Sequence, residues 1–186
     1  MDAVPRKRVV RVLLAAAVLL PAVLLLAWLI NPFAAQSLDP RERILGLGLY
    51  HNVSESMLPT LQPGQVVLVR AGYYHANRPQ RGELVVVRVT TDGSQQRWLK
   101  RVVGLPGEQV EIRNGKVHID GRMLAEPYVA PESRDSAYSR HMAAVTVAEG
   151  HYFLLGDNRD NSYDSRLLGS IDGQDLLARV VQWQKN

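Results

Sequence analysis

The sequence predicts a mainly β protein that carries one transmembrane helix at its N-terminus. Three observations lead to this fold class. Residues 12–30 form an uncharged apolar run, and short runs rich in valine and leucine, bounded by glycine and proline, follow from about residue 46. Asn114 and Gly115 lie between two segments that alternate apolar and polar residues, which is the strongest short signal of a β-hairpin.

The apolar run, VLLAAAVLLPAVLLLAWLI, is long enough to cross a bilayer as a helix. At about 1.5 Å per residue, residues 12–30 extend over ~29 Å, close to the ~30 Å hydrocarbon core of a membrane. A cleaved signal peptide is the alternative, but such peptides have shorter apolar regions of ~7–15 residues and a small-x-small cleavage site. No well-placed triplet of that kind follows closely behind Ile30, so we expect an uncleaved anchor over residues 12–30.

The basic charge of the chain is concentrated before this run. The whole chain has 22 Lys+Arg against 18 Asp+Glu, a net charge of +4. Residues 1–11 hold four of the basic side chains and one acidic one, a balance of +3, which leaves +1 for the rest. A nearly neutral body argues against a groove for nucleic acid. Positive charge before a span predicts a cytoplasmic stub over residues 1–11 and an extracytoplasmic location for the remainder.

Other residue types exclude several kinds of site. The chain has no cysteine, which rules out a disulfide scaffold, a thiolate nucleophile and a cysteine-based metal site. The Gly-x-Ser-x-Gly pattern of hydrolase nucleophile elbows is absent. The five histidines do not have metal-ligand spacing, and although a Ser-His-Asp triad stays open, nothing points to it: His51, His75, His118, His141 and His151. We expect no metal and no cofactor.

The segment after the anchor divides into a connector and one β domain. Residues 31–45 are polar, contain two prolines and are interpreted as a juxtamembrane connector. Residues 46–186 are enough for one domain with a sizeable core. Expected strands cover residues 65–69, 83–89, 98–103, 109–113, 116–120, 152–155 and 178–183. Residues 125–150 show no clear period and are interpreted as an excursion or long loop.

Lys100 is unusual because it lies inside a run of Trp, Leu and Val that should be at least half buried. Desolvation lowers the pKa of a lysine from its ordinary value of ~10.4, sometimes by ~3–5 units. A neutral lysine amine can act as a general base and activate a serine hydroxyl, as in a Ser-Lys dyad. The alternative is a solvated lysine that points outward from an edge strand.

A polar segment over residues 156–166 follows the expected strand at residues 152–155. Asx turns could account for Asp157 and Asn158. They do not account for Asp164 and Arg166, whose opposite charges could pair and support a neighbouring site. A solvated polar loop is the alternative for this segment taken alone.

Four segments together resemble the type I signal peptidases, which are bacterial membrane-anchored serine proteases of the Ser-Lys kind. Ser-Met-Leu-Pro-Thr-Leu at residues 56–61 is similar to the nucleophile motif of that family, and Lys-Arg-Val-Val-Gly-Leu-Pro-Gly at residues 100–107 to its lysine motif. Residues 156–166 and 79–87 resemble the two remaining motifs. The motifs occur in the family order, cover roughly residues 46–183 and follow an anchor of the expected orientation.

The resemblance implies a role for individual residues. Ser56 would be the nucleophile and Lys100 its general base, with Ser162 hydrogen-bonded to the lysine amine. The Ser54 hydroxyl and the Ser56 backbone N–H would form the oxyanion hole. Asp164 and Arg166 would form a supporting ion pair.

The same resemblance implies shallow pockets for small residues at the −1 and −3 positions of a substrate that binds as an added strand. The residues expected to line them are Tyr50, Asn52, Val53, Met57, Trp98 and Leu99. Three positions depart from the family pattern. Val53 replaces a frequent proline, Leu168 stands where an aromatic residue usually precedes glycine, and Glu55 places an acid beside the nucleophile. These departures affect the shape of the pockets and not the catalytic atoms.

The resemblance implies a membrane-anchored endopeptidase that removes signal peptides from exported preproteins through an acyl-enzyme on Ser56. The implied fold is a mainly antiparallel β domain of coiled sheets. Expected partners are preprotein signal peptides and membrane lipid, with no nucleic acid and a monomeric chain. Two alternatives remain: a self-cleaving Ser-Lys regulator, which would lack the anchor and the segment at residues 156–166, and a membrane-tethered β domain that binds partners without catalysis.

Overall fold

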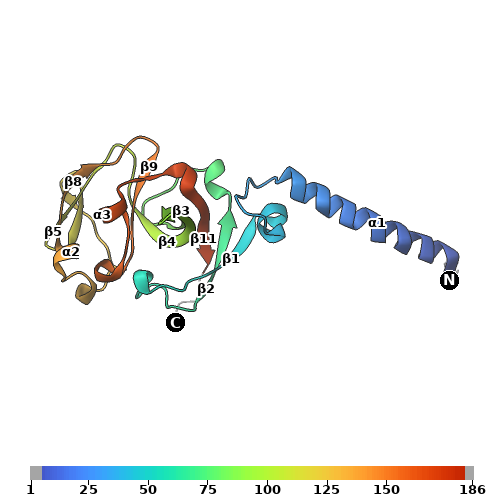
Figure 1. The fold of residues 1–186 in the computed structure, drawn as a ribbon, viewed down its shortest axis with the longest axis horizontal. Coiled ribbons are helices and arrows are strands. Elements are labelled where there is room, and N and C mark those ends of the chain that lie inside the picture. The colour runs from blue at the N-terminus through green and yellow to red at the C-terminus, as the bar shows by residue number, and fades with distance from the viewer. Residues whose placement is uncertain (1–5, 183–186) are drawn as a thin grey trace.

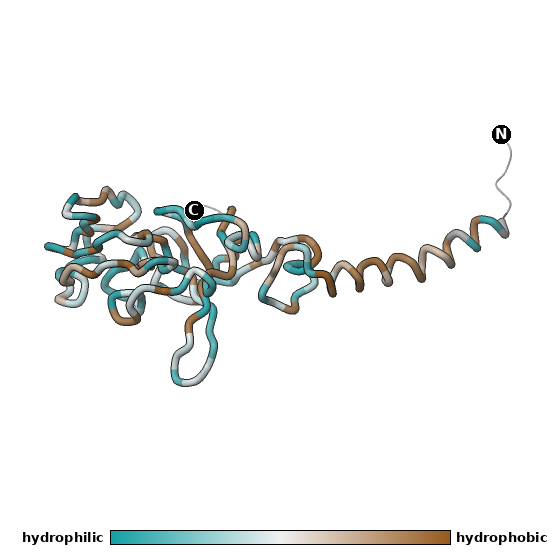
Figure 2. The backbone as a smooth tube through the Cα atoms, turned by 90° about the horizontal axis from the view of Figure 1, so that it is seen from above, coloured by the Kyte–Doolittle hydropathy of each residue, from teal (hydrophilic) through white to brown (hydrophobic). Residues whose placement is uncertain are grey.

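A long N-terminal helix extends away from a β body in the structure, which is a computed structural model describing residues 6–182 (Figure 1). Helix α1 (Arg6–Ile30) is continuous through Pro21. The most apolar stretch of its segment Arg8–Ile30 has a mean hydropathy of 2.8, and the segment is long and apolar enough to cross a membrane. Figure 2 shows this apolar character along the helix, which does not pack against the β body. Residues 1–5 of the predicted stub lie outside the described residues, and residues 6–11 belong to the helix.

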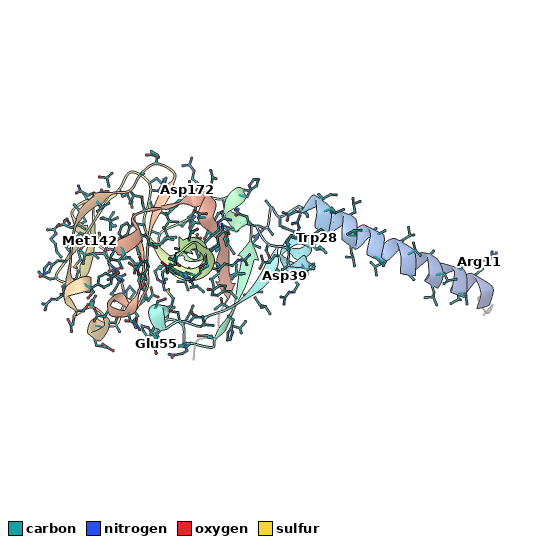
Figure 3. All side chains as sticks on the ribbon, in the orientation of Figure 1. Arg11, Trp28, Asp39, Glu55, Met142 and Asp172 are labelled. Atoms are coloured by element: carbon teal, nitrogen blue, oxygen red, sulfur yellow. The ribbon has the colours of Figure 1, made fainter. Side chains whose placement is uncertain are left out.

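The connector after α1 is folded against both the helix and the β body. The guanidinium of Arg43 lies 4.5 Å from the ring centre of Trp28, and its Nε donates to the Trp28 carbonyl over 2.9 Å. The Trp28 indole donates to the Leu38 carbonyl over 3.1 Å. Figure 3 shows Trp28 and Asp39 at the junction between helix and body. The polar connector predicted at residues 31–45 is therefore an ordered segment, which contains a π-helical turn, η1 (Arg41–Leu45).

Two antiparallel sheets make up the β body. The larger has the strand order β1-β2-β11-β3-β4-β9-β10. Its strands are β1 (Leu47–His51), β2 (Val66–Ala71), β3 (Leu84–Thr91), β4 (Ser94–Gly104), β9 (His151–Leu155), β10 (Ile171–Asp172) and β11 (Leu176–Gln182). The smaller has the order β7-β6-β5-β8 and lies at the end of the body opposite α1 (Figure 1). Its strands are β5 (Gln109–Arg113), β6 (Lys116–Ile119), β7 (Arg122–Met123) and β8 (His141–Thr146).

Short helical segments connect these strands. The α-helical ones are α2 (Ala137–Arg140) and α3 (Ser165–Leu168). The 3-10 turns are η2 (Glu55–Met57), η3 (Tyr73–His75), η4 (Pro131–Ser133), η5 (Arg159–Asn161) and η6 (Gly173–Asp175). The mainly β fold class is confirmed by this arrangement.

The predicted strands are present, with shifts of a few residues at their ends. Asn114 and Gly115 both have positive φ, 50° and 72°, as the turn of the predicted hairpin requires. Residues 125–150 were interpreted as an excursion or long loop, and the long-loop alternative was wrong, because β8 pairs with β5 inside that segment. Strand β8 is largely exposed, so it lacks the apolar alternation by which a strand is recognised. The end of the last predicted strand, Trp183, lies outside the described residues.

Strands β3 and β4 form the centre of the body. Residues 84–87 of β3 are all buried, and so are residues 99–104 of β4. Strands covered on both faces are expected to be continuously apolar, which explains the Leu-Val-Val-Val run that begins at Leu84. Lys100 interrupts the same pattern in β4, and it lies directly across from Val85. The ionisable side chain of Lys100 therefore lies among the most buried residues of the larger sheet.

Candidate active site

Ser56 and Lys100 meet in the structure. Ser56 lies in the 3-10 turn η2 and Lys100 in β4, 44 residues later, yet the Lys100 Nζ donates to the Ser56 Oγ over 2.9 Å. Each residue is 5% exposed. The structure thus brings together the two residues that sequence reasoning had selected as nucleophile and base, within the distance that proton transfer requires.

The environment of Lys100 favours its neutral form. Burial lowers the pKa of Lys100 to about 8, and the positive charge of Arg166 acts in the same direction. The negative charges of Asp164 and Asp157 oppose this shift. Burial dominates because a charged amine loses its hydration in the protein interior. At pH 7 roughly one amine in ten is therefore neutral and able to accept a proton.

The turn that carries Ser56 is fixed by the polar segment that follows β9. The Asn158 backbone N–H donates to the Ser56 carbonyl over 3.1 Å, and its side chain donates to the Glu55 carbonyl over 3.3 Å. The Asn161 amide donates to the Glu55 carboxylate over 3.0 Å. Figure 3 shows Glu55 at the edge of the β body. Residues 156–166 thus contact the turn and are not the solvated loop that the sequence left open.

The two predicted oxyanion donors are bonded to each other. The Ser56 backbone N–H donates to the Ser54 Oγ over 3.1 Å, so that Ser54 is the N-cap of η2. Serine is a favoured N-cap because its oxygen satisfies an N–H that has no partner inside the turn. In this structure the Ser54 Oγ therefore occupies the Ser56 N–H, the backbone donor of the predicted oxyanion hole.

Ser162 does not make its predicted hydrogen bond to Lys100. The Ser162 Oγ is buried and has no hydrogen-bond partner within the described part of the chain. It lies against Gly156, where an added Cβ would be 2.2 Å from the Ser162 Oγ and 2.5 Å from the Ser56 carbonyl oxygen. The hydroxyl therefore packs beside the nucleophile turn, while the Lys100 amine bonds to the Ser56 Oγ.

The predicted pair of Asp164 and Arg166 is confirmed as a buried, two-pronged ion pair. The Arg166 Nε and one terminal nitrogen each donate over 2.8 Å to a different oxygen of Asp164. The Gly156 backbone N–H donates to the same carboxylate over 3.0 Å, and the Tyr138 ring lies 4.1 Å from the guanidinium. The pair thereby holds the residues on either side of the Ser162 position.

A second buried ion pair was not predicted. Arg101 bonds to Asp157 through its Nε over 2.8 Å and through a terminal nitrogen over 2.5 Å. The Thr60 hydroxyl also donates to Asp157, which links the segment after the nucleophile turn to this pair. Two adjacent charges at residues 100 and 101 of an apolar strand must point to opposite faces, and this signal could have identified a partner requirement for Arg101. A third buried pair, between Arg159 and Glu126, fixes the same loop from its other side.

A groove of about 450 Å³ opens beside the Ser56 and Lys100 pair. Predicted residues that line it are Tyr50, Asn52, Val53, Trp98 and Leu99, together with Ser54, Ser56 and Lys100. Sequence reasoning missed Gln96, Arg97, Asn161 and Tyr163. The placement of Met57 in a substrate pocket was wrong, since its side chain is fully buried in the hydrophobic core. Within residues 6–182, no three His, Asp or Glu side chains gather in a way that could hold a metal ion.

Within residues 6–182, one wall of the groove is a strand edge without a pairing strand. Strand β4 pairs with β3 along residues 94–101, but β9 joins its other side only from Arg101 onward. The Trp98 ring at this edge packs edge-on against Tyr163, with ring centres 5.7 Å apart. The site therefore combines a buried, hydrogen-bonded serine and lysine with an open edge to which an extended peptide can be added.

This chain is similar in sequence to a known family and to several of its members. A family model described as signal peptidase, peptidase S26, matches residues 7–183. Signal peptidase I of Leptolyngbya laminosa is 38% identical over 134 residues, which cover 69% of this chain and 64% of that protein. Signal peptidase I of Bacillus amyloliquefaciens is 36% identical over 137 residues, which cover 70% of this chain and 67% of that protein.

A solved structure is also similar, the crystal structure of a signal peptidase I from Enterococcus faecalis V583. It is 34% identical, with a TM-score of 0.48, and the match covers 57% of this chain and 98% of that one. This chain spans about two thirds of the length of the curated relatives that it matches, 64% and 66% for the first two.

Proposed function

Since this chain belongs to the signal peptidase family, peptidase S26, we propose that it is a membrane-anchored serine endopeptidase that cleaves signal peptides from exported preproteins. One observation carries the proposal. The Lys100 Nζ and the Ser56 Oγ are 2.9 Å apart, and both residues are buried beside an open groove. A non-catalytic binding domain has no need for a desolvated lysine next to a serine hydroxyl, because burial of that amine opposes folding.

The chemistry begins with proton transfer inside the pair. The neutral Lys100 amine accepts the Ser56 proton as the Ser56 Oγ attacks the scissile carbonyl carbon. The tetrahedral intermediate collapses when the peptide C–N bond breaks, and Lys100 returns the proton to the departing amine of the mature protein. The signal peptide is then held as an ester on Ser56. Lys100 then takes a proton from water as the water attacks this ester, and it returns the proton to the Ser56 Oγ as the ester C–O bond breaks. The signal peptide leaves as a carboxylic acid, and Ser56 and the neutral Lys100 are restored.

Stabilisation of the oxyanion requires the N-cap of the nucleophile turn to open. When the scissile carbonyl enters, its oxygen replaces the Ser54 Oγ as acceptor for the Ser56 N–H. The Ser54 hydroxyl then rotates and donates its own hydrogen to the same oxygen. One hydrogen-bond acceptor is exchanged for another, and the gain appears only as negative charge develops in the transition state.

The substrate binds as an extended strand in the groove. Its backbone pairs with the free edge of β4, and its small side chains enter shallow pockets between this edge and the segment around Val53. Val53 is 77% exposed in the empty groove, so a substrate that covers it gains apolar contact.

The anchor sets the location of the reaction. Helix α1 fits a membrane span, with the basic residues of the stub at residues 1–11 in the cytoplasm and the anchor at residues 12–30. The connector at residues 31–45 and the catalytic β domain at residues 46–186 then lie outside, where exported chains emerge. The protein acts as a monomer in contact with membrane lipid and uses no cofactor.

Incubation of the detergent-solubilised protein with a preprotein tests the proposal. Mass spectrometry should find one cleavage, behind small residues that follow the apolar segment of the signal peptide. The Ser56→Ala variant is the matched control, since it removes one oxygen atom, and it should leave the preprotein intact while the domain still folds. Persistent cleavage by Ser56→Ala, or none by the wild type, would contradict the proposed activity.

A further inference from the structure

A tyrosine crosses the groove in the empty site. The Tyr50 hydroxyl, on β1, donates to the backbone carbonyl of Arg97, on β4, over 2.6 Å. These strands are not neighbours, because β2, β11 and β3 lie between them in the sheet. Both residues line the groove. The bond therefore joins the two walls between which the substrate has to lie.

The Arg97 carbonyl belongs to the unpaired edge of β4. The Val102 backbone N–H donates to the Glu83 carbonyl beside β3 over 2.9 Å. Because backbone groups alternate sides along an antiparallel strand, those of Leu99 and Arg97 point away from β3 and toward the groove. The contact with Tyr50 agrees with this direction. In β-augmentation, such outward groups pair with the incoming peptide.

We propose that Tyr50 is a latch on the substrate groove: its hydroxyl occupies the Arg97 carbonyl in the empty enzyme, and the substrate strand displaces it in order to pair with β4. This inference rests on the proposed function, since it concerns the binding of the same substrate. It makes Tyr50 a residue that sets the affinity for extended peptides, in addition to lining a pocket.

The movable partner of this bond is Tyr50. Arg97 is held in β4 by its pairing with β3, and its guanidinium lies 3.6 Å from the Glu42 carboxylate of the connector. Burial raises the pKa of Tyr50, so its hydroxyl stays protonated and keeps its hydrogen for donation at neutral pH. In the empty groove, a carbonyl at this exposed edge takes a donor from water or from a nearby side chain. The latch supplies that donor until a substrate N–H takes its place.

Displacement of the latch reduces the affinity of every extended peptide by the net worth of one hydrogen bond, about two- to tenfold. The Tyr50→Phe variant keeps the ring and removes only the hydroxyl. We expect its KM to fall by about two- to tenfold while kcat stays within twofold of the wild type, because the bond exists only in the empty enzyme and is absent from both the bound ground state and the transition state.

Tyr74→Phe is the matched control. The Tyr74 hydroxyl donates to Glu83 over 2.8 Å outside the groove, so its removal should leave KM unchanged. A KM of Tyr50→Phe that equals or exceeds the wild-type value would overturn the latch.

A binding measurement without turnover separates this inference from the proposed activity. In the Ser56→Ala background, a synthetic signal-peptide segment should bind about two- to tenfold more tightly when Tyr50→Phe is added. Replacing the backbone amides of the peptide by esters, one at a time, should abolish that gain at one position, the residue whose N–H pairs with Arg97. A gain that survives every ester would overturn the latch. Failure of the wild type to cleave any preprotein would instead overturn the proposed function, and the binding result would still decide the latch.

Discussion

The two sides of the groove differ in how ready they are for a substrate. On the catalytic side, Ser56 and Lys100 are buried and already hydrogen-bonded. On the binding side, Ser54 and Val53 are exposed, and the groups that should meet the substrate are bonded to the protein itself. The Ser54 Oγ accepts from the Ser56 N–H, and the Arg97 carbonyl accepts from Tyr50.

This difference follows from the solvation that each side requires. A lysine becomes a base near neutral pH only where water is excluded, so its site must be complete before the substrate arrives. A strand edge that admits a peptide must stay accessible, and its backbone groups need partners in the meantime. The catalytic side is therefore preformed, and the binding side is held closed by side chains that a substrate can exchange.

Substitution of Lys100, on the catalytic side, should cause the largest loss of kcat among the substitutions in this comparison. Lys100→Met keeps a side chain of similar length but has no basic atom, and kcat should fall by about 10²–10⁴-fold. Lys100→Arg should be equally inactive, because a guanidinium does not lose its proton in a protein. Single-turnover cleavage of a preprotein measures the loss. Activity of Lys100→Met within tenfold of the wild type would remove Lys100 from the mechanism.

The same variant should be more stable than the wild type. The pKa of Lys100 is about 8 in the folded protein, against 10.5 for an ordinary lysine. Below pH 8, Lys100 is protonated in both the folded and the unfolded state. The full cost of burying the charged amine then lowers the free energy of unfolding. Between pH 8 and 10.5 the unfolded state holds more protons, so stability rises with pH and the penalty disappears. At pH 7, Lys100→Met should raise the free energy of unfolding by up to about 3 kcal/mol, measured by denaturant titration.

Substitution of Ser54, on the binding side, should cause a smaller loss of kcat than substitution of Lys100. Ser54→Ala removes one oxyanion donor, and a loss of about 10²–10³-fold in kcat with little change in KM is expected. It also removes the N-cap of η2, which should reduce stability by about 1 kcal/mol. Ser54→Thr keeps the hydroxyl and serves as the control that retains both functions in part. Equal kcat values for Ser54→Ala and the wild type would exclude Ser54 from the oxyanion hole.

The sequence was most informative where a residue contradicted its local pattern. Lys100 in an apolar strand and Asp164 next to Arg166 in a polar segment required partners, and the structure supplies them. Met57 was assigned to a pocket by the family resemblance, but the 3-10 turn directs it into the core. The catalytic role of Lys100 and the supporting role of Asp164 and Arg166 stay predictions.

Other contacts depend on how distant strands pack and could not be anticipated. Tyr50 and Arg97 are 47 residues apart on strands that are not adjacent, so no spacing or periodicity indicates their bond. The rotamers of Ser54 and Ser162 likewise depend on which neighbour accepts or excludes their hydroxyl groups. Strand β8 takes its backbone partners from β5 and little from its own exposed side chains.

The buried charges around Lys100 should tune its pKa without removal of a reacting atom, and we expect these charges to have the smallest effect on activity. For the wild type, kcat/KM should rise with pH, and the midpoint of this rise should lie at about pH 8, where Lys100 loses its proton. Asp164 raises and Arg166 lowers the pKa of Lys100. Asp164→Asn should therefore move the midpoint to lower pH, and Arg166→Met should move it to higher pH.

Both of these variants break a buried ion pair, at a cost of about 3–5 kcal/mol in stability, so a merely structural defect would lower the activity of each in a similar way. Only an electrostatic influence on the base moves their midpoints in opposite directions. Profiles of kcat/KM against pH for the two variants and the wild type distinguish the cases. Midpoints that shift in the same direction, or not at all, would show that the pair fixes the loop and does not act on the proton of Lys100.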